Sequence, residues 1–383
     1  MKILMVTNYF DSHQGGIEIV AEKLFRGLIQ RKSEVVWAAA NVSASPAEEA
    51  GGRVLPLKSW NGVESIAGLP FPVPGIGALM SIWSEAGHSD IVIIHDCLYL
   101  ANIAAFLSAR LQRVPIMIVQ HIGLVPYRNI LLNAIMKLSN LLVTRPMLAS
   151  AQQVVFISQI IFHFFNSVHF RKAPEIIFNG VDAEIFRPVC ADESKESIRE
   201  SMGLPRDGRV VLFVGRFVEK KGIPVLKHMV ELRPAWTWAF AGWGPLNPGG
   251  WNAASVRVLS SLRGASIAAL YRACDLLVLP SIGEGFPLVV QEALASGLPV
   301  VCSAETLEAD PEIRTFARGV PIYAGDDIRT AREFLSAIDE ALDEGAEARN
   351  QAEARHAFAA ARYSWKSAAE QYHELALSLV AAT

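Results

Sequence analysis

Residues 276–301 read LLVLPSIGEGFPLVVQEALASGLPVV, and this stretch decides the fold. The apolar run 276–279 is typical of a strand buried on both faces, and residues 281–285 are rich in turn formers. Pro287 suits the first position of a helix, Gly297 suits the position just past its end, and LPVV opens the next apolar strand. The stretch therefore predicts a strand–loop–helix–strand unit of a parallel sheet, in which ligands bind beyond the carboxyl ends of the strands.

Two carboxylates flank the loop and the start of this helix. Glu284 is on the loop, and Glu292 follows eight residues later on the helix. Carboxylates accept hydrogen bonds and suit the hydroxyls of a sugar or ribose, while the free amides of residues 288–290 suit a phosphate. Acidic residues near a helix N-terminus are also favoured by the helix dipole alone. The spacing by itself leaves both interpretations open.

The amino-acid sequence of this stretch resembles the E-x7-E motif of glycosyltransferase family 4, whose members are retaining enzymes that use nucleotide sugars. The matching residues are Pro280, Ser281, Glu284, Gly285, Phe286, Glu292, Ala293, Gly297, Pro299 and Val300. The resemblance implies the α/β fold GT-B, in which two Rossmann-like domains face each other across a central cleft. It also implies that Glu284 holds the transferred sugar and Glu292 the donor ribose. The donor-binding residues expected on this stretch are Gly285, Phe286, Pro287, Leu288 and Glu292.

Length and composition agree with two domains that bury large cores. The chain has 383 residues, of which 51% are hydrophobic and 19% charged. The net charge of −3 argues against general affinity for nucleic acid. Its four cysteines form no C-x-x-C pair and predict reduced thiols rather than a zinc site. Because no apolar run approaches a membrane span or a signal peptide, we expect a cytoplasmic protein.

Four segments are expected along the chain. An N-terminal, acceptor-binding Rossmann-like domain covers residues 1–182 and closes with N-G-V-D, a string that is similar to the family's. The polar residues 183–208 are expected to be a linker with a short helix. Residues 209–365 are expected to form the nucleotide-sugar-binding Rossmann-like domain. The helix of residues 366–383 is expected to return to the first domain.

The N-terminal domain opens with a strand, a glycine turn and a helix. Gly15 and Gly16 form the turn, and a glycine pair lets the backbone approach a ligand closely. Most glycine pairs are only turns. The resemblance implies more, because the family commonly has G-G-x-E here facing the donor phosphates, and Gly15, Gly16 and Glu18 occupy those positions.

Histidines follow two later strands of this domain. His95 and Asp96 end one strand, and His121 follows another, at the ligand edge of the sheet. A lone histidine is more often a hydrogen-bonded structural residue. For His121 the resemblance implies a position near the donor sugar and the acceptor.

A cationic string follows the first strand of the second domain. Arg216 and Lys221 stand in G-R-x4-K-G, which resembles the family's diphosphate-binding string. Fixed cations at a strand end stabilise the charge of a departing nucleoside diphosphate. The resemblance implies catalytic roles for Arg216, Lys221, Glu284 and His121. Residues 246–255 depart from the family's pattern, so the base stays open between UDP- and GDP-linked donors.

Residues 127–144 form the most amphipathic segment of the chain, with apolar residues at helical spacing. One interpretation is a helix packed on the core of the first domain. The other is a helix on an anionic membrane surface, since residues 97–181 carry seven basic residues and one acidic residue. In that case the protein is peripheral on the inner face of the membrane.

The sequence therefore predicts a retaining, metal-independent glycosyltransferase without a cofactor. Its partners are a nucleotide-sugar donor and a glycan or lipid-linked acceptor, and no nucleic acid. The alternative is a non-catalytic GT-B protein that binds a nucleotide sugar or a membrane partner. A sugar-nucleotide epimerase on the same fold is a further alternative, but it fits the E-x7-E sequence less well.

Overall fold

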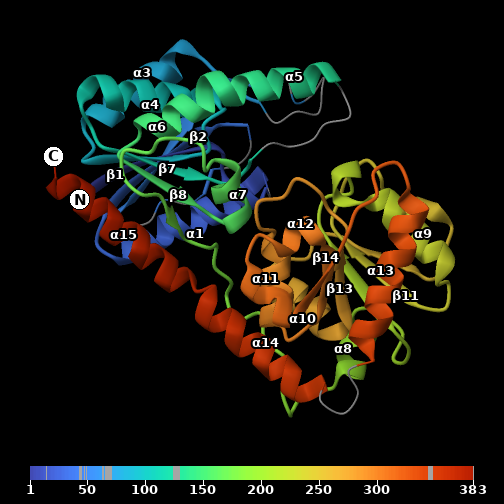
Figure 1. Cartoon of the computed structure of the whole chain (residues 1–383). Helices are drawn as coiled ribbons and strands as arrows, with labels where there is room; N and C mark the ends of the chain where they lie inside the picture. Colours follow the sequence, from blue (N-terminus) through green and yellow to red (C-terminus); the bar gives the residue numbers. More distant parts are fainter. Residues whose placement is uncertain are drawn as a thin grey trace. The chain divides into compact units, whose positions relative to one another are not determined.

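The computed structural model describes the chain except residues 14, 43, 44, 47, 49, 63, 65–70, 124–129, 344–347 and 383. The chain divides into two compact units, Met1–Asn179 with Trp365–Thr383, and Gly180–Ser364. Each unit is built on a parallel sheet covered by helices, the Rossmann-like arrangement that the sequence predicts (Figure 1). Residues 183–208, expected as a linker, group with the second unit.

The sheet of the first unit has seven strands in the order β3-β2-β1-β6-β7-β8-β9, and every neighbouring pair is parallel. Its central strands are apolar and buried over most of their length, because helices cover both faces. The strands are β1 (Lys2–Tyr9), β2 (Glu34–Ala40), β3 (Gly52–Leu57), β6 (Ile91–His95), β7 (Ile116–Gln120), β8 (Gln153–Phe156) and β9 (Glu175–Ile176). A separate antiparallel pair joins β4 (Ser59–Trp60) to β5 (Val73–Pro74).

The helices of this unit connect successive strands. They are η1 (Asp11–His13), α1 (Gly16–Gln30), α3 (Ile76–Gly87), α4 (Leu100–Gln112), α5 (Ile130–Ser139), the π-helical turn η2 (Asn140–Thr144), α6 (Arg145–Ser150) and α7 (Gln159–Phe164). The last helix of the chain, α15 (Trp365–Ala381), also belongs to this unit and packs against α1. Arg31 fastens the two helices, because its guanidinium donates to the backbone carbonyl of Lys366 at 2.8 Å.

The helix α5 corrects one interpretation of the amphipathic segment. None of its residues is buried, so it is not a helix packed into the core. Its apolar residues point to solvent instead: Ile130, Leu131, Ile135 and Leu138 are exposed. Tyr127 and Arg128 of the predicted segment lie outside the described residues. Among the helices that the structure describes, none has the length and apolar character needed to cross a bilayer.

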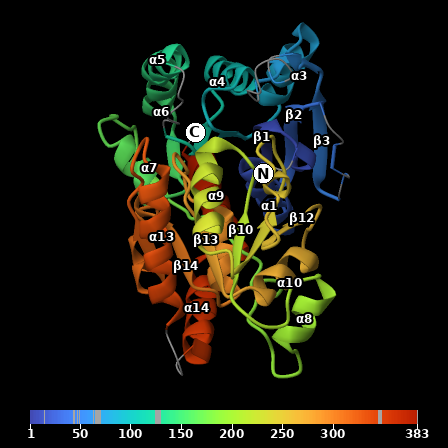
Figure 2. The same cartoon turned by 90° about the vertical axis from the view of Figure 1, so that its right-hand side faces the viewer.

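The sheet of the second unit has six parallel strands in the order β12-β11-β10-β13-β14-β15 (Figure 2). The strands are β10 (Val210–Val214), β11 (Thr237–Ala241), β12 (Val256–Leu259), β13 (Leu276–Leu279), β14 (Val300–Ser303) and β15 (Ala317–Val320). The helices are α8 (Lys195–Ser201), η3 (Glu219–Lys221), α9 (Ile223–Leu232), η4 (Pro248–Trp251), α10 (Ala265–Ala273), α11 (Leu288–Ala295), α12 (Ala304–Leu307), η5 (Pro311–Thr315), α13 (Asp327–Leu342) and α14 (Ala348–Arg362).

The predicted strand–loop–helix–strand unit is confirmed as β13, α11 and β14. Pro287 is the N-cap of α11 rather than its first residue, and Gly297 follows the helix with a φ of 78°. The other end of the unit is anchored by α14, where His356 Nδ1 lies 2.6 Å from the carbonyl oxygen of Ala295. The loop between β13 and α11 therefore starts and ends on fixed elements.

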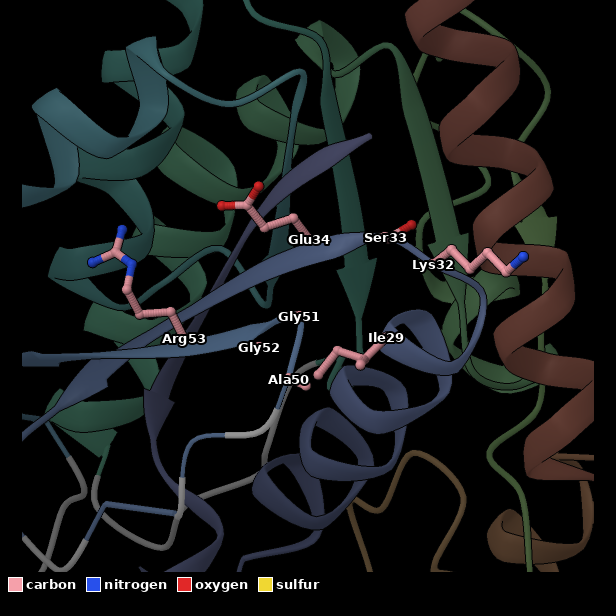
Figure 3. Close-up of a pocket in the computed structure, with 8 residues that line it drawn as sticks. All are labelled: Ile29, Lys32, Ser33, Glu34, Ala50, Gly51, Gly52 and Arg53. Carbon is pink, nitrogen blue, oxygen red and sulfur yellow. The ribbon is translucent and has the colours of Figure 1, made fainter.

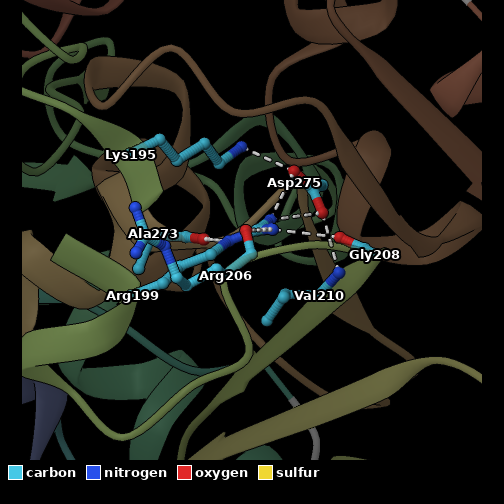
Figure 4. A network of polar contacts seen from close by, with 7 residues as sticks. All are labelled: Lys195, Arg199, Arg206, Gly208, Val210, Ala273 and Asp275. Atoms are coloured by element: carbon cyan, nitrogen blue, oxygen red, sulfur yellow. Dashed lines mark hydrogen bonds and ion pairs between the residues drawn. The ribbon is translucent and has the colours of Figure 1, made fainter. Parts of the chain in front are cut away.

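A partly buried ion pair ties α8 to the start of the second sheet (Figure 4). Arg199 Nη2 donates to both carboxylate oxygens of Asp275 at 2.9 and 2.8 Å, and the backbone amide of Val210 donates to the same carboxylate at 2.7 Å. Lys195 Nζ lies 2.5 Å from Asp275. Arg199 also donates to the backbone carbonyls of Ala273, Arg206 and Gly208. This network fixes the chain immediately before β10 and β13, the two strands that lead to the candidate site.

Candidate functional site

Glu284 lies between two lysines at the carboxyl edge of the second sheet. Lys221 Nζ is 3.0 Å from Glu284 Oε2, and Lys220 Nζ is 3.6 Å from Glu284 Oε1. Burial raises the pKa of the Glu284 carboxyl, but the charges of the two lysines outweigh burial and hold that pKa below its ordinary value. Glu284 is therefore an ionised acceptor held in one place, as a sugar-binding carboxylate needs to be.

A glycine allows the turn that carries Lys221 to lie close to the loop that carries Glu284. Gly222, next to Lys221, has a φ of 74°, and a Cβ placed on it would lie 2.2 Å from the carbonyl oxygen of Pro280. Pro280 begins the loop that carries Glu284, and Ile282 donates its amide to the carbonyl of Lys220 at 2.9 Å. A side chain at position 222 would push the lysine turn away from the loop.

Arg216 follows β10 at the same edge of the sheet. Its guanidinium stacks over the ring of Trp243, with the guanidinium carbon 4.8 Å from the ring centroid. Among the described residues, its buried Nε has no hydrogen-bond partner. A Cβ placed on the neighbouring Gly215 would lie 3.8 Å from Lys221 Cδ, so the aliphatic part of the Lys221 side chain passes beside the residue that precedes Arg216. Arg216 thus retains a free donor of the kind that binds a phosphate oxygen.

Glu292 projects from α11 and has a partner that the motif does not contain. The hydroxyl of Tyr271, on α10, donates to Glu292 Oε2 at 2.8 Å. Burial raises the pKa of the Glu292 carboxyl to about 7, although the tyrosine hydrogen bond opposes that rise. Glu292 therefore changes charge close to neutral pH, and Tyr271 favours its ionised form.

The other residues expected to bind the donor lie at the start of α11. Phe286 is 3% exposed and packs edge-on against the ring of Tyr363, while Gly285 and Leu288 are partly exposed. Pro287 is buried and leads directly into the start of α11, where the amide of Val290 donates to the carbonyl of Pro287 at 3.0 Å. Glu305 Oε2, on α12, accepts a hydrogen bond from the amide of Gly283 at 3.3 Å and gives the loop a second support.

In the first unit, Gly15 and Gly16 begin α1. Gly15 is the N-cap, and a Cβ on it would lie 2.0 Å from Glu18 Oε2, so the carboxylate of Glu18 folds back over this glycine. Around Gly16 there is open space. Burial raises the pKa of Glu18 to about 7, and the nearby Asp96 contributes to the rise. The glycine turn and the end of β6 are therefore close enough to interact electrostatically.

His121 follows β7 and is almost fully buried. Its Nε2 lies 2.9 Å from Nδ1 of His95, the last residue of β6, and its backbone amide donates to Asp96 Oδ1 at 2.8 Å. The structure thus joins three polar residues that the sequence placed at two separate strand ends.

Two contacts of the site were not predicted from the sequence. Tyr271 and Trp243 each contact a motif residue, Glu292 and Arg216 respectively, from a different element. Both are isolated aromatic residues with no neighbouring pattern. Their contacts become visible only in the structure, where α10 packs beside α11 and the turn after β11 lies beside Arg216.

A hollow of about 520 Å³ lies in the first unit and is lined by residues of α1, β2, β3 and the segments beside them (Figure 3). It is open to solvent and lies at the amino ends of β2 and β3, where Glu34 and Arg53 are among the residues that line it. The candidate residues of this unit lie at the opposite, carboxyl edge. Within the described ranges, no three or more His, Cys, Asp or Glu side chains gather as a metal site would require.

Two family models match consecutive parts of the chain. The model described as Glycosyltransferase Family 4 matches residues 14–185, and the model described as Glycosyl transferases group 1 matches residues 208–343. The second match contains the cationic string and the E-x7-E stretch, and the first contains the glycine turn and His121.

Two relatives match the chain over part of their length. The putative teichuronic acid biosynthesis glycosyltransferase TuaC of Bacillus subtilis is 39% identical over 113 residues, which cover 29% of this chain and 29% of that protein. D-inositol 3-phosphate glycosyltransferase of Mycolicibacterium smegmatis is 29% identical over 215 residues, which cover 51% of this chain and 45% of that protein. The matched region thus spans less than half the length of either relative.

A solved structure matches over the full length. Sucrose-phosphate synthase of Thermosynechococcus elongatus aligns over 100% of both chains with a TM-score of 0.74 and 18% sequence identity. That likeness concerns the fold, and it agrees with the two parallel-sheet units described above. It shows that the chain has the GT-B fold, and the two family models show that the chain resembles the family 4 and group 1 glycosyltransferases.

Proposed function

We propose that the protein is a retaining glycosyltransferase that moves a sugar from a nucleotide-sugar donor to a hydroxyl of a glycan or lipid-linked acceptor. The observation that carries this proposal is the contact between Lys221 and Glu284 at 3.0 Å, next to the strand end that bears Arg216. It joins a cation for the leaving diphosphate to a carboxylate for the transferred sugar.

Donor binding follows from the chemistry of each group. The amides at the start of α11 and the cations of Arg216 and Lys221 suit the negatively charged diphosphate. Glu292 accepts hydrogen bonds from the ribose hydroxyls, and Glu284 accepts them from the sugar. We propose a UDP- or GDP-linked sugar as the donor. Gly15, Gly16 and His121 of the first unit are proposed as further substrate-binding residues.

The transfer step breaks the bond between the anomeric carbon and the phosphate oxygen. Arg216 and Lys221 stabilise the negative charge that develops on that oxygen. The acceptor hydroxyl attacks from the same face and passes its proton to the departing phosphate, so the anomeric configuration is retained. The cations supply charge stabilisation, and we therefore propose that transfer needs no metal ion.

Thermal unfolding of the purified protein with a panel of UDP-, GDP-, ADP- and dTDP-sugars tests the donor proposal. A ligand at about a hundred times its dissociation constant adds roughly 2.7 kcal/mol to the free energy of unfolding. We expect one nucleotide to raise Tm in the wild type and to lose that effect in Glu292→Ala. A panel without any shift would instead favour a non-catalytic protein of the same fold.

Two measurements test the finer parts of the mechanism. With the donor known, NMR of the product reports the configuration of the new glycosidic bond, and an inverted product would overturn the retaining mechanism. Turnover in the presence of excess EDTA tests independence from metal, and a loss that is restored by added divalent ions would overturn that part.

We also propose that the first unit contacts the anionic inner face of a membrane through α3, α4 and α5. These helices lie on one side of the unit in both views (Figures 1 and 2). Exposed large apolar residues gather on them: Ile76, Leu79, Met80, Trp83, Leu107, Leu111, Ile130, Leu131, Ile135 and Leu138. The sequences of α4 and α5 contain no Asp or Glu, while Arg110, Arg113 and Lys137 are exposed. Apolar area beside basic charge suits an anionic lipid surface.

Co-sedimentation with vesicles tests this contact. We expect the wild type to bind vesicles that contain anionic lipid, and Leu138→Glu to weaken binding with little change in Tm, because Leu138 is 55% exposed. Leu232→Glu, at a 38% exposed site in the second unit, is the matched control and should bind normally. A wild type that ignores anionic vesicles would rule out the membrane contact.

A further inference from the structure

Four buried polar side chains, one of them that of His121, lie together at the turn after β7. They are His95, Asp96, Asn102 and His121, and the most exposed of them, Asp96, is 4% exposed. They come from the end of β6, the beginning of α4 and the end of β7. Buried polar groups are unfavourable unless they are hydrogen-bonded. The hydrogen bonds among these four residues therefore show how His121 is held.

The backbone bonds of this group hold the turn in place. Asn102 Nδ2 donates to the carbonyl oxygens of His95 and Asp96 at 2.6 and 2.8 Å. Asp96 adopts a φ of 65°, which is unfavourable for a residue with a side chain and is stabilised here by those bonds. Its carboxylate in turn accepts the amide of His121 at 2.8 Å. The position of His121 is therefore set by three residues from two other elements.

The two imidazoles share one hydrogen bond. His95 Nδ1 and His121 Nε2 are 2.9 Å apart, and the rings are inclined by 21°. Burial lowers the pKa of His95 to about 3 and also holds the pKa of His121 well below its ordinary value. Both rings are thus neutral at pH 7 and carry one N–H each. One of those two protons lies between the rings.

The remaining nitrogen of His95 decides which ring donates. His95 Nε2 is buried and has no hydrogen-bond partner among the described residues. Buried N–H groups without a partner are rarer than buried acceptors without one. The proton of His95 is therefore at Nδ1, where it is donated to His121 Nε2. This leaves the single proton of His121 at Nδ1.

We propose that His95 is a positioning residue that holds His121 as its Nδ1–H tautomer, so that His121 donates a hydrogen bond and does not act as a general base. The ligand class that this donor suits is a neutral or anionic oxygen, such as a sugar hydroxyl or a phosphate oxygen. The encounter of His121 with such an oxygen rests on the proposed function. The tautomer itself is a property of the free protein.

NMR of the full chain labelled with ¹⁵N-histidine tests the tautomer without any substrate. We expect the ring signals of His121, assigned with His121→Gln, to show a protonated Nδ1 and an unprotonated Nε2. His95→Asn should preserve that pattern, since its amide can donate from nearly the position of Nδ1. His95→Leu should give a mixture of tautomers. A wild-type His121 protonated at Nε2 would overturn the proposal.

Kinetics test whether the tautomer matters for transfer. We expect His95→Leu to lower kcat about tenfold, as loss of an oriented hydrogen bond does, and His95→Asn to restore most of the rate. The rise in Tm with donor serves as the folding control in both variants. Equal rates in the wild type and a correctly folded His95→Leu would overturn the positioning role. A wild type without transfer activity would contradict the proposed function, while the NMR result would still decide the tautomer.

Discussion

Lys221 Nζ lies 3.0 Å from Glu284 Oε2, and the two side chains are only 15% and 14% exposed. This contact joins two motifs that are far apart in the sequence. It also means that each residue keeps the other in place before any substrate arrives. An anionic diphosphate that binds near Lys221 would compete with Glu284 for the ammonium group.

We predict that Lys221→Ala and Glu284→Ala each lower the rate of transfer at least about a hundredfold, the scale for losing one fixed group that stabilises transition-state charge. The matched control is Lys220→Ala, because Lys220 is 3.6 Å from the same carboxylate and 40% exposed. It should stay within a few-fold of the wild type. Transfer rates and circular dichroism decide the matter, and near-normal turnover in a folded Glu284→Ala would contradict the mechanism.

We predict that Tyr271→Phe weakens donor binding by removing the hydroxyl that lies 2.8 Å from Glu292. The lost hydrogen bond to a carboxylate should also lower the free energy of unfolding by about 1–3 kcal/mol. Tyr363→Phe is the control, since it removes a similar tyrosine–carboxylate bond, to Asp310 at 2.6 Å. Calorimetric titration with the donor should separate the two variants. Equal donor affinities in the two variants would show that Tyr271 acts on stability alone.

We predict that donor affinity falls as the pH falls through 7. Burial raises the pKa of Glu292 to about 7, so the carboxyl is protonated below that pH and ionised above it. Only the ionised form accepts hydrogen bonds at both oxygens. With one proton involved, the dissociation constant should be about tenfold larger at pH 6 than at pH 8. In Glu292→Gln, binding should be weaker, and the part of the pH dependence caused by Glu292 should disappear.

Tyr271→Phe sharpens this pH prediction. The tyrosine hydrogen bond lowers the pKa of Glu292, so its removal should move the midpoint of binding to higher pH. An unchanged midpoint in Tyr271→Phe would show that another group controls the pH dependence.

We predict that Arg199→Ala lowers the free energy of unfolding of the second unit by about 1.5–3 kcal/mol, the range for losing hydrogen bonds to a charged group, because Asp275 keeps Lys195 and the Val210 amide as partners. The Arg199 side chain is 6% exposed and binds Asp275 through both carboxylate oxygens. Arg206→Ala is the control, because that side chain is 65% exposed and 3.9 Å from its carboxylate partner. Chemical denaturation measures both. A similar small loss in the two variants would mean that Asp275 is satisfied without Arg199.

The strand–loop–helix–strand unit was predictable because its signals are local. A short apolar run, a proline and a glycine mark β13 and the two ends of α11, and each acts through the conformation of its own backbone. The same holds for the glycine turn before α1. In these places the amino-acid pattern and the three-dimensional structure carry the same information.

The amphipathic segment shows where local pattern stops being informative. Apolar residues at helical spacing predict a helix, and the structure has α5 there. The pattern does not say what the apolar face contacts, since a core and a membrane favour the same residues. Only the packing of the unit shows that no residue of α5 is buried.

By itself, the sequence determined the two parallel-sheet units, the family resemblance and the identities of the charged motif residues, because these depend on periodicity, turn formers and short strings. The tertiary structure alone decided which residues contact the motif residues: Lys221 with Glu284, Tyr271 with Glu292 and His95 with His121. Each of these pairs joins two different elements of one unit. Their distances follow from strand order and helix packing, which a side chain's neighbours in the sequence do not encode.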